Sequence, residues 1–397
     1  MTTPRHILIA HSRYQVQGGE ESVIEAERDL LRSRGHTVEI LWRLNDDIQT
    51  MPKARLLGET LWSRPSQRLM LQAIAEQRPD IIHLHNIHPL LSPAIYWAIR
   101  RTGTPIVQTI HNFRWLCPQG MMLRHEQVCE DCVGRLPWRA VTRRCYRDSA
   151  LQSAVLAATY ALHTRIGSLH RNADRIIALT GFARDKLISG GLPADRLVIK
   201  GNFLEDPLQG AALPPDTDRN DRVLYVGRLS EEKGIQVLVK AATALPATLF
   251  DVIGQGPLEL PRPDNVTFHG FLDKARIHAA MRRSALLVLP SLCYEGMPMV
   301  LIEAYANGLP VLASRLGALA DLVEDGVTGL LFNPGDTDDL AAKLRWVQAH
   351  PDKIRQMGLR AREKYLAYYT AGRNYERLMQ IYAEAAAHRA RPHPTSC

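Results

Sequence analysis

The sequence predicts an α/β fold of two doubly wound domains, each built on a parallel sheet covered by helices. Three observations lead to this prediction. The chain has 397 residues, which exceeds one typical domain core and suits two domains. Short apolar runs alternate with helix-period segments along most of the chain, as is typical of parallel sheets. A Pro- and Asp-rich stretch at 205–221 interrupts the alternation, which then restarts.

The first half of the chain carries six apolar runs that we interpret as strands. Helical patterns lie between several of them, including 21–34, ended by Gly35, and 89–101, ended by Gly103. The strands are expected at 7–10, 38–41, 81–84, 106–110, 176–179 and 197–199.

The second half repeats the pattern after the linker at 205–221. A helix is expected near 234–244, and 336–389 is nearly all helical. We therefore divide the chain into domains at 1–205 and 206–370, followed by a helix at 371–397 that packs back on the first domain. Ligands of such sheets bind outside the carboxyl ends of the strands, so the cleft between the domains is the expected site. The strands are expected at 223–226, 249–253, 266–268, 286–289 and 311–313.

The composition is that of a globular protein, with 46% hydrophobic and 23% charged residues. No run approaches the roughly 18–20 apolar residues of a membrane span. The N-terminus shows no cleavable signal pattern, so we expect a cytoplasmic protein. The net charge of +8 fits nucleic acid, an anionic membrane or a phosphorylated substrate. Base-stacking aromatics are sparse among the basic residues, which disfavours nucleic acid.

Two glutamates, Glu295 and Glu303, are the most specific feature of the second half. Glu295 lies in the loop after the strand expected at 286–289, and Pro298 fits the first position of the next helix. Glu303 then lies about five residues into that helix, roughly 8 Å along its axis. Acids at this separation suit a ligand with hydroxyl groups at both ends and phosphates between them, since a helix start offers N–H donors. The alternative for Glu303, a solvated helix face, is disfavoured by its apolar neighbours.

A basic turn, GRLSEEKG at 227–234, follows the strand expected at 223–226. Arg228 and Lys233 bracket it. Arginine can fork onto two phosphate oxygens, whereas lysine supplies a point charge. Alone, the pattern is as typical of a solvated turn. Its place in the same domain as Glu295 favours an anion-binding role.

Two features of the first half indicate a ligand. Gly18 and Gly19 precede the first helix, where glycine allows close approach to the backbone, although such a pair is more often a simple turn. The full Gly-x-Gly-x-x-Gly pattern is missing, and no acid ends the second strand, which disfavours an NAD-dependent oxidoreductase. His111 closes the strand expected at 106–110. A histidine there is often structural, but its place at the carboxyl edge favours function.

Together these residues resemble the retaining glycosyltransferases of family 4, which have the GT-B architecture of two Rossmann-like domains facing each other across a cleft. The most specific shared element is the pair Glu295 and Glu303, with seven residues between them in EGMPMVLIEA. The resemblance spans essentially the whole chain and includes QGGEES at 17–22, GQGP at 254–257 and VTFHGFL at 266–272. The family often has Pro-Asn-Gly where this chain has Gly201, Asn202 and Phe203, so no ligand role is carried over to Asn202.

The resemblance implies a role for each domain and for each motif. Residues 1–205 would bind the acceptor, and 206–370 the nucleotide-sugar donor. Arg228 and Lys233 would bind the donor diphosphate, and Glu303 the ribose hydroxyls. Glu295 and the amides after it would hold the transferred sugar, Gly19 would approach the diphosphate, and His111 would lie at the reacting centre. The implied catalytic residues are His111, Arg228, Lys233 and Glu295. The implied donor-binding residues are Gly18, Gly19, Arg228, Lys233, Gly254, Gly270, Glu295, Gly296, Met297, Pro298, Val300 and Glu303.

Four cysteines, Cys117, Cys129, Cys132 and Cys145, cluster in a basic, loop-like insert at about 115–147. Stable disulfides are uncommon in a cytoplasmic chain, and four thiolates suit a closed, structural zinc site. The alternatives are four ordinary thiols or a redox pair at C-x-x-C. Some family 4 members resemble this chain in having such an insert.

The resemblance also implies the reaction. A UDP- or GDP-sugar would donate a sugar, of hexosyltransferase type, with retention of anomeric configuration and no cofactor for catalysis. The acceptor would be a saccharide or lipid-linked saccharide in polysaccharide or cell-envelope biosynthesis. The basic first domain and the stretch at 151–169 would allow peripheral contact with the anionic inner face of the cytoplasmic membrane, although we slightly favour a core helix for that stretch. The alternatives are a nucleotide-sugar epimerase of the same fold and, less favoured, a zinc-containing nucleic-acid-binding protein.

Overall fold

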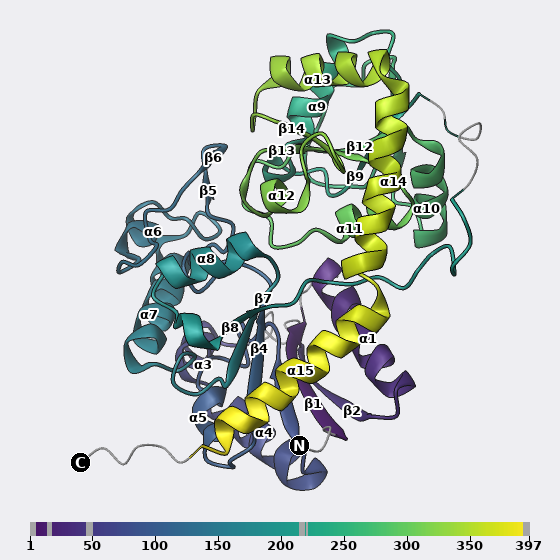
Figure 1. The fold of residues 1–397 in the computed structure, drawn as a ribbon. Helices are drawn as coiled ribbons and strands as arrows, with labels where there is room; N and C mark the ends of the chain where they lie inside the picture. The colour runs from purple at the N-terminus through teal and green to yellow at the C-terminus, as the bar shows by residue number, and fades with distance from the viewer. Residues whose placement is uncertain (1–4, 14–17, 45–50, 214–218, 220, 392–397) are drawn as a thin grey trace. The chain divides into compact units, whose positions relative to one another are not determined.

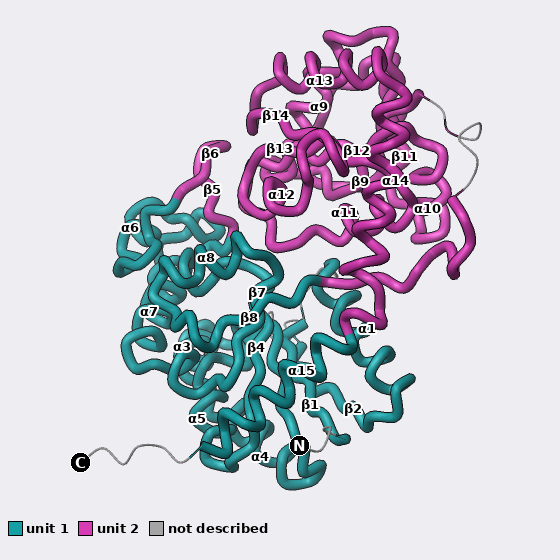
Figure 2. Tube along the Cα trace, viewed as in Figure 1, with its two compact units in different colours: residues 1–120, 130–201, 375–397 teal, residues 121–129, 202–374 magenta. Residues whose placement is uncertain are grey.

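The computed structural model describes residues 5–13, 18–44, 51–213, 219 and 221–391. The chain forms two compact units, drawn in different colours in Figure 2. Unit 1 comprises Met1–Gly120, Glu130–Gly201 and Tyr375–Cys397, and unit 2 comprises Met121–Cys129 and Asn202–Asn374. The expected domain boundaries, 205 and 370, lie a few residues from the points where the chain passes from unit 1 to unit 2, after Gly201, and back to unit 1, after Asn374. Of the expected linker, 214–218 and 220 lie outside the described residues, as does Gln17 of the Gly-Gly motif.

Unit 1 is built on a six-stranded parallel sheet with the order β2-β1-β3-β4-β7-β8. The central strands are apolar runs buried on both faces, as parallel sheets require. The strand order reverses at β1, which places a switch point between β1 and β3. Their bounds are β1 (His6–Arg13), β2 (Thr37–Leu44), β3 (Ile81–Leu84), β4 (Ile106–Ile110), β7 (Arg175–Ala178) and β8 (Leu197–Ile199).

The helices of unit 1 begin and end at recognisable signals. Ser63 caps α4 by accepting a hydrogen bond from the backbone of Ser66, and Ser149 caps α7, which ends at Gly167 in the left-handed region. None of the described helices combines the length and apolar composition that a membrane span needs. Their bounds are α1 (Gly19–Ser33), α3 (Lys53–Trp62), α4 (Arg64–Gln77), α5 (Ile95–Arg100), α6 (Trp138–Thr142), α7 (Ala150–Ile166), α8 (Gly181–Ser189) and α15 (Ala371–Arg389).

The C-terminal helix α15, yellow in Figure 1, is part of the core of unit 1. Its buried side chains Leu378 and Tyr382 pack in one apolar cluster with Ile9 of β1 and Ile24 of α1. At its end, Arg389 donates to the buried carboxylate of Asp174 over 2.6 Å.

Unit 2 contains a second six-stranded parallel sheet, ordered β11-β10-β9-β12-β13-β14. This is the Rossmann order, and its switch point lies between β9 and β12. A short antiparallel hairpin, β5 (Leu123–Arg124) and β6 (Gln127–Val128), is also assigned to this unit. The strands are β9 (Val223–Val226), β10 (Phe250–Ile253), β11 (Val266–Gly270), β12 (Leu286–Leu289), β13 (Val311–Ser314) and β14 (Gly329–Phe332). The helices are α9 (Ile235–Thr243), α10 (Lys274–Arg283), α11 (Met299–Ala306), α12 (Gly317–Leu322), α13 (Thr337–Ala349) and α14 (Pro351–Tyr368).

The predicted α/β fold is confirmed, although several elements differ, among them one helix and one strand. The helix expected at 89–101 is wrong, because only Ile95–Arg100 is helical. Before it, Ser92 has a φ of +56°, and a residue that precedes proline, here Pro93, is kept out of the helical region. The strand Gly329–Phe332 was not predicted, since its four residues carry too short a pattern.

Candidate functional site

The topology of unit 2 brings three of the predicted site residues together at the switch point of its sheet. Arg228 and Lys233 follow β9, and Glu295 follows β12, which is hydrogen-bonded to β9. In doubly wound sheets, ligands bind where the strand order reverses, outside the carboxyl ends of the strands. The residues are therefore gathered at the position where this fold binds ligands.

An ion pair between Lys233 and Glu295 forms the centre of this site. Lys233 Nζ lies 2.7 Å from Glu295 Oε1, and the hydroxyl of Ser291 donates to the same oxygen over 2.7 Å. Burial by itself would lower the pKa of Lys233, but the Glu295 carboxylate raises it overall. The lysine is thus a fixed positive charge. Beside it, burial raises the pKa of the Cys293 thiol to about 12, so this cysteine stays protonated.

Two glycines allow the backbone segments of this site to approach closely. Gly234 has a φ of +66°, and a Cβ on it would lie 1.8 Å from the carbonyl oxygen of Pro290 at the end of β12. Gly254 has a φ of +139°, and a Cβ on it would lie 1.8 Å from the carbonyl oxygen of Gly227. Its N–H donates to the carbonyl of Gly270 over 2.8 Å. Because glycine has no Cβ, the loops after β9, β10 and β12 can pack directly against one another here.

Arg228 extends from the turn after β9 toward solvent, with 63% of its side chain exposed. Its backbone is fixed, because the buried Tyr225 donates its hydroxyl hydrogen to the Arg228 carbonyl over 2.8 Å. Its guanidinium lies 3.9 Å from Glu232, beyond hydrogen-bond distance. An exposed guanidinium on a rigid turn is suited to an external anion.

The loop from Glu295 to Pro298 leads into α11, which begins at Met299 rather than at Pro298, one residue later than predicted. The buried Asn202 holds this loop: its side-chain amide donates to the Met297 carbonyl over 3.0 Å. Asn202 therefore has a structural task, a contact that the sequence did not indicate. Gly296 lies within the loop, and Val300 is the second residue of α11.

Glu303 is the fifth residue of α11 and is half-buried. Burial raises the pKa of its carboxyl group, and Lys274 on α10 opposes this effect. Within the described residues, no side chain or backbone group donates a hydrogen bond to this carboxylate. A half-buried carboxylate without an internal donor is suited to accept hydrogen bonds from hydroxyl groups of a ligand.

Unit 1 carries the remaining predicted residues. Gly18 is the N-cap of α1 and Gly19 its first residue, and the Gly18 N–H donates to Glu21 Oε2 over 3.4 Å. Among the described residues, none lies within 4 Å of the position that a Cβ on Gly18 would take. His111 directly follows β4.

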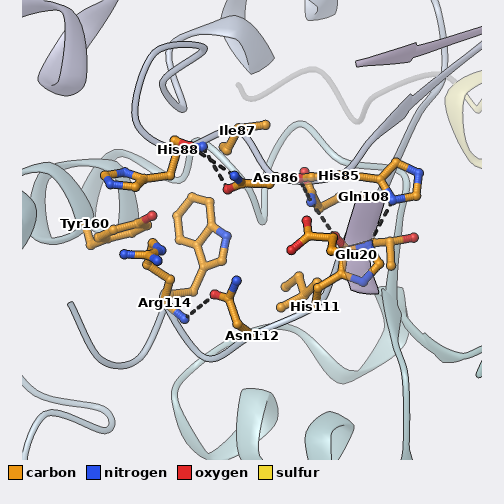
Figure 3. Close-up of a pocket in the computed structure, with 13 residues that line it drawn as sticks. Glu20, His85, Asn86, Ile87, His88, Gln108, His111, Asn112, Arg114 and Tyr160 are labelled. Atoms are coloured by element: carbon orange, nitrogen blue, oxygen red, sulfur yellow. Dashed lines mark hydrogen bonds between the residues drawn. The ribbon is translucent and has the colours of Figure 1, made fainter. Parts of the chain in front are cut away.

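His111 lines a small polar cavity of about 30 Å³, shown in Figure 3, together with Glu20, His85, Arg114 and Tyr160. This volume holds about one water molecule. Burial, aided by the positive charge of neighbours such as Lys200, lowers the pKa of His111 to about 3. The imidazole is therefore neutral near pH 7, and it acts as a hydrogen-bonding group rather than as a charge.

Sequence reasoning missed the surroundings of His111. Its Nε2 lies 2.9 Å from Nδ1 of the buried His85. The sequence feature that could have identified His85 is the alternation His83-Leu84-His85 at the end of β3, since alternate residues of an extended chain lie on one side. Nearby, Glu27 is buried on α1. The sequence feature that could have identified Glu27 is its place as a charged residue within the apolar stripe of a helix.

The four cysteines of the insert are each half-buried. Cys117, Cys132 and Cys145 belong to unit 1, whereas Cys129 ends the segment assigned to unit 2. The zinc site stays a prediction.

A larger cavity in unit 2, of about 940 Å³, lies at the opposite edge of the sheet, where β9 and β13 begin. Two of its arginines serve the fold: Arg222 pairs with Asp251 over 2.6 Å, and Arg219 donates to backbone carbonyls, including that of Asn307. Ligand sites of this fold lie at the other edge, so we place the functional site at the switch point.

The sequence matches two family models. The model described as "Glycosyltransferase Family 4" matches residues 17–205, and "Glycosyl transferases group 1" matches 220–350. A D-inositol 3-phosphate glycosyltransferase of Nocardia farcinica is 34% identical over 345 residues, covering 80% of this chain and 69% of the relative. A glycogen synthase of Mycobacterium tuberculosis is 27% identical over 333 residues, covering 80% and 72%.

Solved structures show the same fold. HepE of Anabaena, in complex with UDP and glucose, aligns with a TM-score of 0.66 at 18% identity, covering 96% of this chain and 99% of that one. A sucrose-phosphate synthase of Thermosynechococcus elongatus aligns with a TM-score of 0.70 at 20% identity, covering 96% and 99%.

Proposed function

Because the chain belongs to the family 4 glycosyltransferases of group 1, we propose that it is a retaining enzyme that moves a hexose from a UDP- or GDP-sugar to a saccharide or lipid-linked saccharide. The observation that carries the proposal is the Lys233–Glu295 ion pair at the switch point of unit 2. It joins a cation suited to phosphate and a carboxylate suited to sugar hydroxyls within 2.7 Å.

In this proposal, unit 2 binds the donor through three groups. Arg228 and Lys233 bind the diphosphate, since an exposed guanidinium and a fixed ammonium suit its oxygens. Glu303 accepts hydrogen bonds from the ribose hydroxyls. Glu295 and the amides of Gly296 and Met297 hold the sugar. Gly254 and Gly270 keep the neighbouring loops in place.

The reaction proceeds by loss of the nucleoside diphosphate. Negative charge grows on the leaving phosphate oxygens, and Arg228, Lys233 and the start of α11 stabilise it. The acceptor hydroxyl attacks the anomeric carbon on the face that the diphosphate leaves, and a phosphate oxygen accepts its proton. Attack on that face gives retention. In unit 1, Gly19 and His111 are the groups that we assign to the diphosphate and to the sugar.

The acceptor in this proposal belongs to polysaccharide or cell-envelope biosynthesis, and unit 1 binds it. Exposed apolar residues lie among arginines on unit 1: Leu136 and Trp138 are 72% and 60% exposed, and Leu151 on α7 is 63% exposed. Such a mixture suits an anionic membrane surface. Cosedimentation with anionic and with neutral vesicles tests this membrane contact. We expect the protein to bind the anionic vesicles only.

The cysteine insert is proposed to bind one structural zinc ion. Native mass spectrometry before and after a chelator measures it. We expect the loss of one zinc mass together with a lower Tm, and an unchanged mass and Tm would remove zinc from the proposal.

A donor screen tests the central proposal. UDP-, GDP- and ADP-sugars are added singly, and Tm, slow sugar release and the anomeric configuration of the product are measured. We expect one donor to raise Tm, the product to keep the donor's configuration, and Glu303→Ala to abolish the Tm shift. If no nucleotide-sugar changes Tm in the wild type, the proposed function is wrong. An inverted product would refute retention alone.

A further inference from the structure

A buried polar cluster lies next to His111 in unit 1, and its member His85 lines the same cavity as His111. Its members are His83 of β3, His85 directly after β3, Glu27 of α1 and Lys200 after β8, and all four are at most 5% exposed. Desolvating so many polar groups costs free energy unless each is paired. Packing of the fold alone does not account for such a cluster.

The cluster contains one carboxylate, and its cation is Lys200. Lys200 Nζ lies 2.8 Å from Glu27 Oε2. Burial by itself would raise the pKa of Glu27, but Lys200 and the two histidines hold it well below its usual range. Glu27 is therefore ionised, and its second oxygen, Oε1, faces the histidines.

The ionised carboxylate determines where the histidine protons lie. Glu27 Oε1 is 3.1 Å from His83 Nδ1 and 3.8 Å from His85 Nε2, and within the described residues His85 Nε2 has no hydrogen-bond partner. A lone pair on Nε2 would face this negative oxygen, so the carboxylate favours a proton on Nε2. Burial holds the pKa of His85 well below its usual range, which leaves the ring neutral. Its other nitrogen, Nδ1, is then an acceptor.

His85 in turn determines the proton of His111. His85 Nδ1 lies 2.9 Å from His111 Nε2, the hydrogen bond drawn as a dashed line in Figure 3. With His85 Nδ1 as acceptor, the proton belongs to His111 Nε2. Because His111 is also neutral, its Nδ1 carries a lone pair.

We propose that Glu27 and His85 are positioning residues that hold His111 as the tautomer protonated on Nε2, so that Nδ1 accepts a hydrogen bond from a hydroxyl group of the bound sugar. The sugar in this inference rests on the proposed function, but the tautomer does not. We call the chain of contacts from Glu27 through His85 to His111 the relay. His83 helps to keep it in place, because its ring contacts the Tyr382 hydroxyl at 2.9 Å and Thr109 Oγ1 at 2.8 Å.

A metal ion is the alternative occupant of this cluster, because one ligand atom each from Glu27, His83 and His85 lies within 4.8 Å of the others. The charge balance disfavours it. Lys200 already neutralises the carboxylate, and a divalent cation would leave two uncompensated positive charges in a buried site. The test below distinguishes the two occupants.

The tautomer is measured on the full-length protein labelled with ¹⁵N-histidine, by long-range ¹H–¹⁵N NMR at several pH values between about 5 and 9. His111→Gln identifies the His111 signals. The charged and titratable groups around His111 within the described residues are those of the cluster and of the cavity: His85, His11, His83, Glu27, Lys200, Glu20, His88, Arg114 and Tyr160. In the wild type we expect a protonated Nε2 and a bare Nδ1 on His111 throughout this range. A proton on Nδ1, or a charged ring, would overturn the proposal.

Two variants test the relay. Glu27→Gln alone would leave the Lys200 charge buried and unpaired, so the first variant is Glu27→Gln/Lys200→Met, which removes both charges. The second is His85→Leu. In both we expect a mixture of His111 tautomers. We also expect turnover to fall about tenfold or more, comparable to the loss when groups that orient a metal-binding histidine are removed.

Asp174→Asn is the matched control. It removes another buried carboxylate of unit 1, one that pairs with Arg389 and His388 of α15 and is no part of the cluster. We expect a lower Tm but the wild-type tautomer. If both relay variants keep the wild-type tautomer, or if the control changes it equally, the proposal is wrong.

Two further measurements distinguish a failure of the proposed function from a failure of the tautomer proposal. The rise in Tm caused by UDP stays unchanged in the relay variants, because the donor groups on unit 2 are intact. If no nucleotide-sugar binds the wild type, the proposed function fails while the tautomer result stands. Adding Zn²⁺ leaves the His83 and His85 nitrogen signals unchanged. A Zn²⁺-induced shift of both would identify a metal site and overturn the relay.

Discussion

The replacement of Gly234 by alanine tests whether the close contact between the β9 turn and the end of β12 forms the donor site. The new Cβ would lie 1.8 Å from the carbonyl oxygen of Pro290. An ordinary C···O contact is about 3.3 Å, so the two segments must separate by roughly 1.5 Å. That movement would break the 2.7 Å contact between Lys233 and Glu295.

The loss of stability expected for Gly234→Ala has two parts, and a control variant separates them. A non-glycine residue in the left-handed region costs about 1–2 kcal/mol, and overpacking adds about 1–3 kcal/mol. We therefore expect Gly234→Ala to destabilise the protein by about 2–5 kcal/mol. Gly326 has a φ of +78° and nothing within 4 Å of its Cβ position, so Gly326→Ala should cost only the first part.

The assay is thermal unfolding with and without the nucleotide-sugar that stabilises the wild type. Each kcal/mol lowers Tm by about 2–4 °C in units of this size. We expect Gly234→Ala to lose the donor-induced rise in Tm and about 100-fold or more in activity, since a displacement of 1 Å has an effect of that order. Gly326→Ala should keep both. Equal Tm values for the two variants, with a retained donor shift in Gly234→Ala, would refute the reasoning.

Three further predictions concern single side chains. Glu303→Gln should raise Tm without ligand at pH 7, because burial raises the pKa of this carboxyl and its ionisation opposes folding. It should also weaken donor binding by about 10- to 100-fold, measured by calorimetry; unaltered affinity would contradict the ribose assignment. Arg228→Gln should leave Tm nearly unchanged, since the side chain is 63% exposed, yet raise the donor KM about tenfold; a normal KM would exclude Arg228 from the diphosphate site. Arg362 holds the pKa of Asp206 below its usual range, so this pair stabilises the fold above pH 4 and is lost as the pH falls through the lowered pKa. Asp206→Asn should cost about 1.5–3 kcal/mol at pH 7 and less in acid, and a cost independent of pH would disprove the linkage.

Features carried by local sequence were predictable. Apolar runs such as 223–226 and 286–289 become strands because burial on both faces demands continuous apolar residues. The turn holding Arg228 and Lys233 and the loop holding Glu295 follow those strands in the chain, so their place at the carboxyl edge follows as well. The failed helix at 89–101 shows the limit, because the restriction that Pro93 places on Ser92 outweighs the helical pattern.

Contacts between distant residues were not predictable. Lys233 and Glu295 are 62 residues apart in the sequence. Their ion pair depends on the close packing of Gly234 against Pro290, which the sequence does not show. Asn202 carries no signal of its contact with the Met297 loop.

The sequence by itself determined the two parallel sheets and the motifs that the chain shares with the glycosyltransferases, because strand periodicity and motif spacing are local properties of the chain. Only the tertiary structure decided which ion pairs and hydrogen bonds the side chains of these motifs and their neighbours form. Lys200 reaches Glu27 across 173 residues, and that ion pair lies beside the histidines next to His111. The proton positions of those histidines depend on burial and on neighbouring charges, which exist only once β3, α1 and the segment after β8 have packed together.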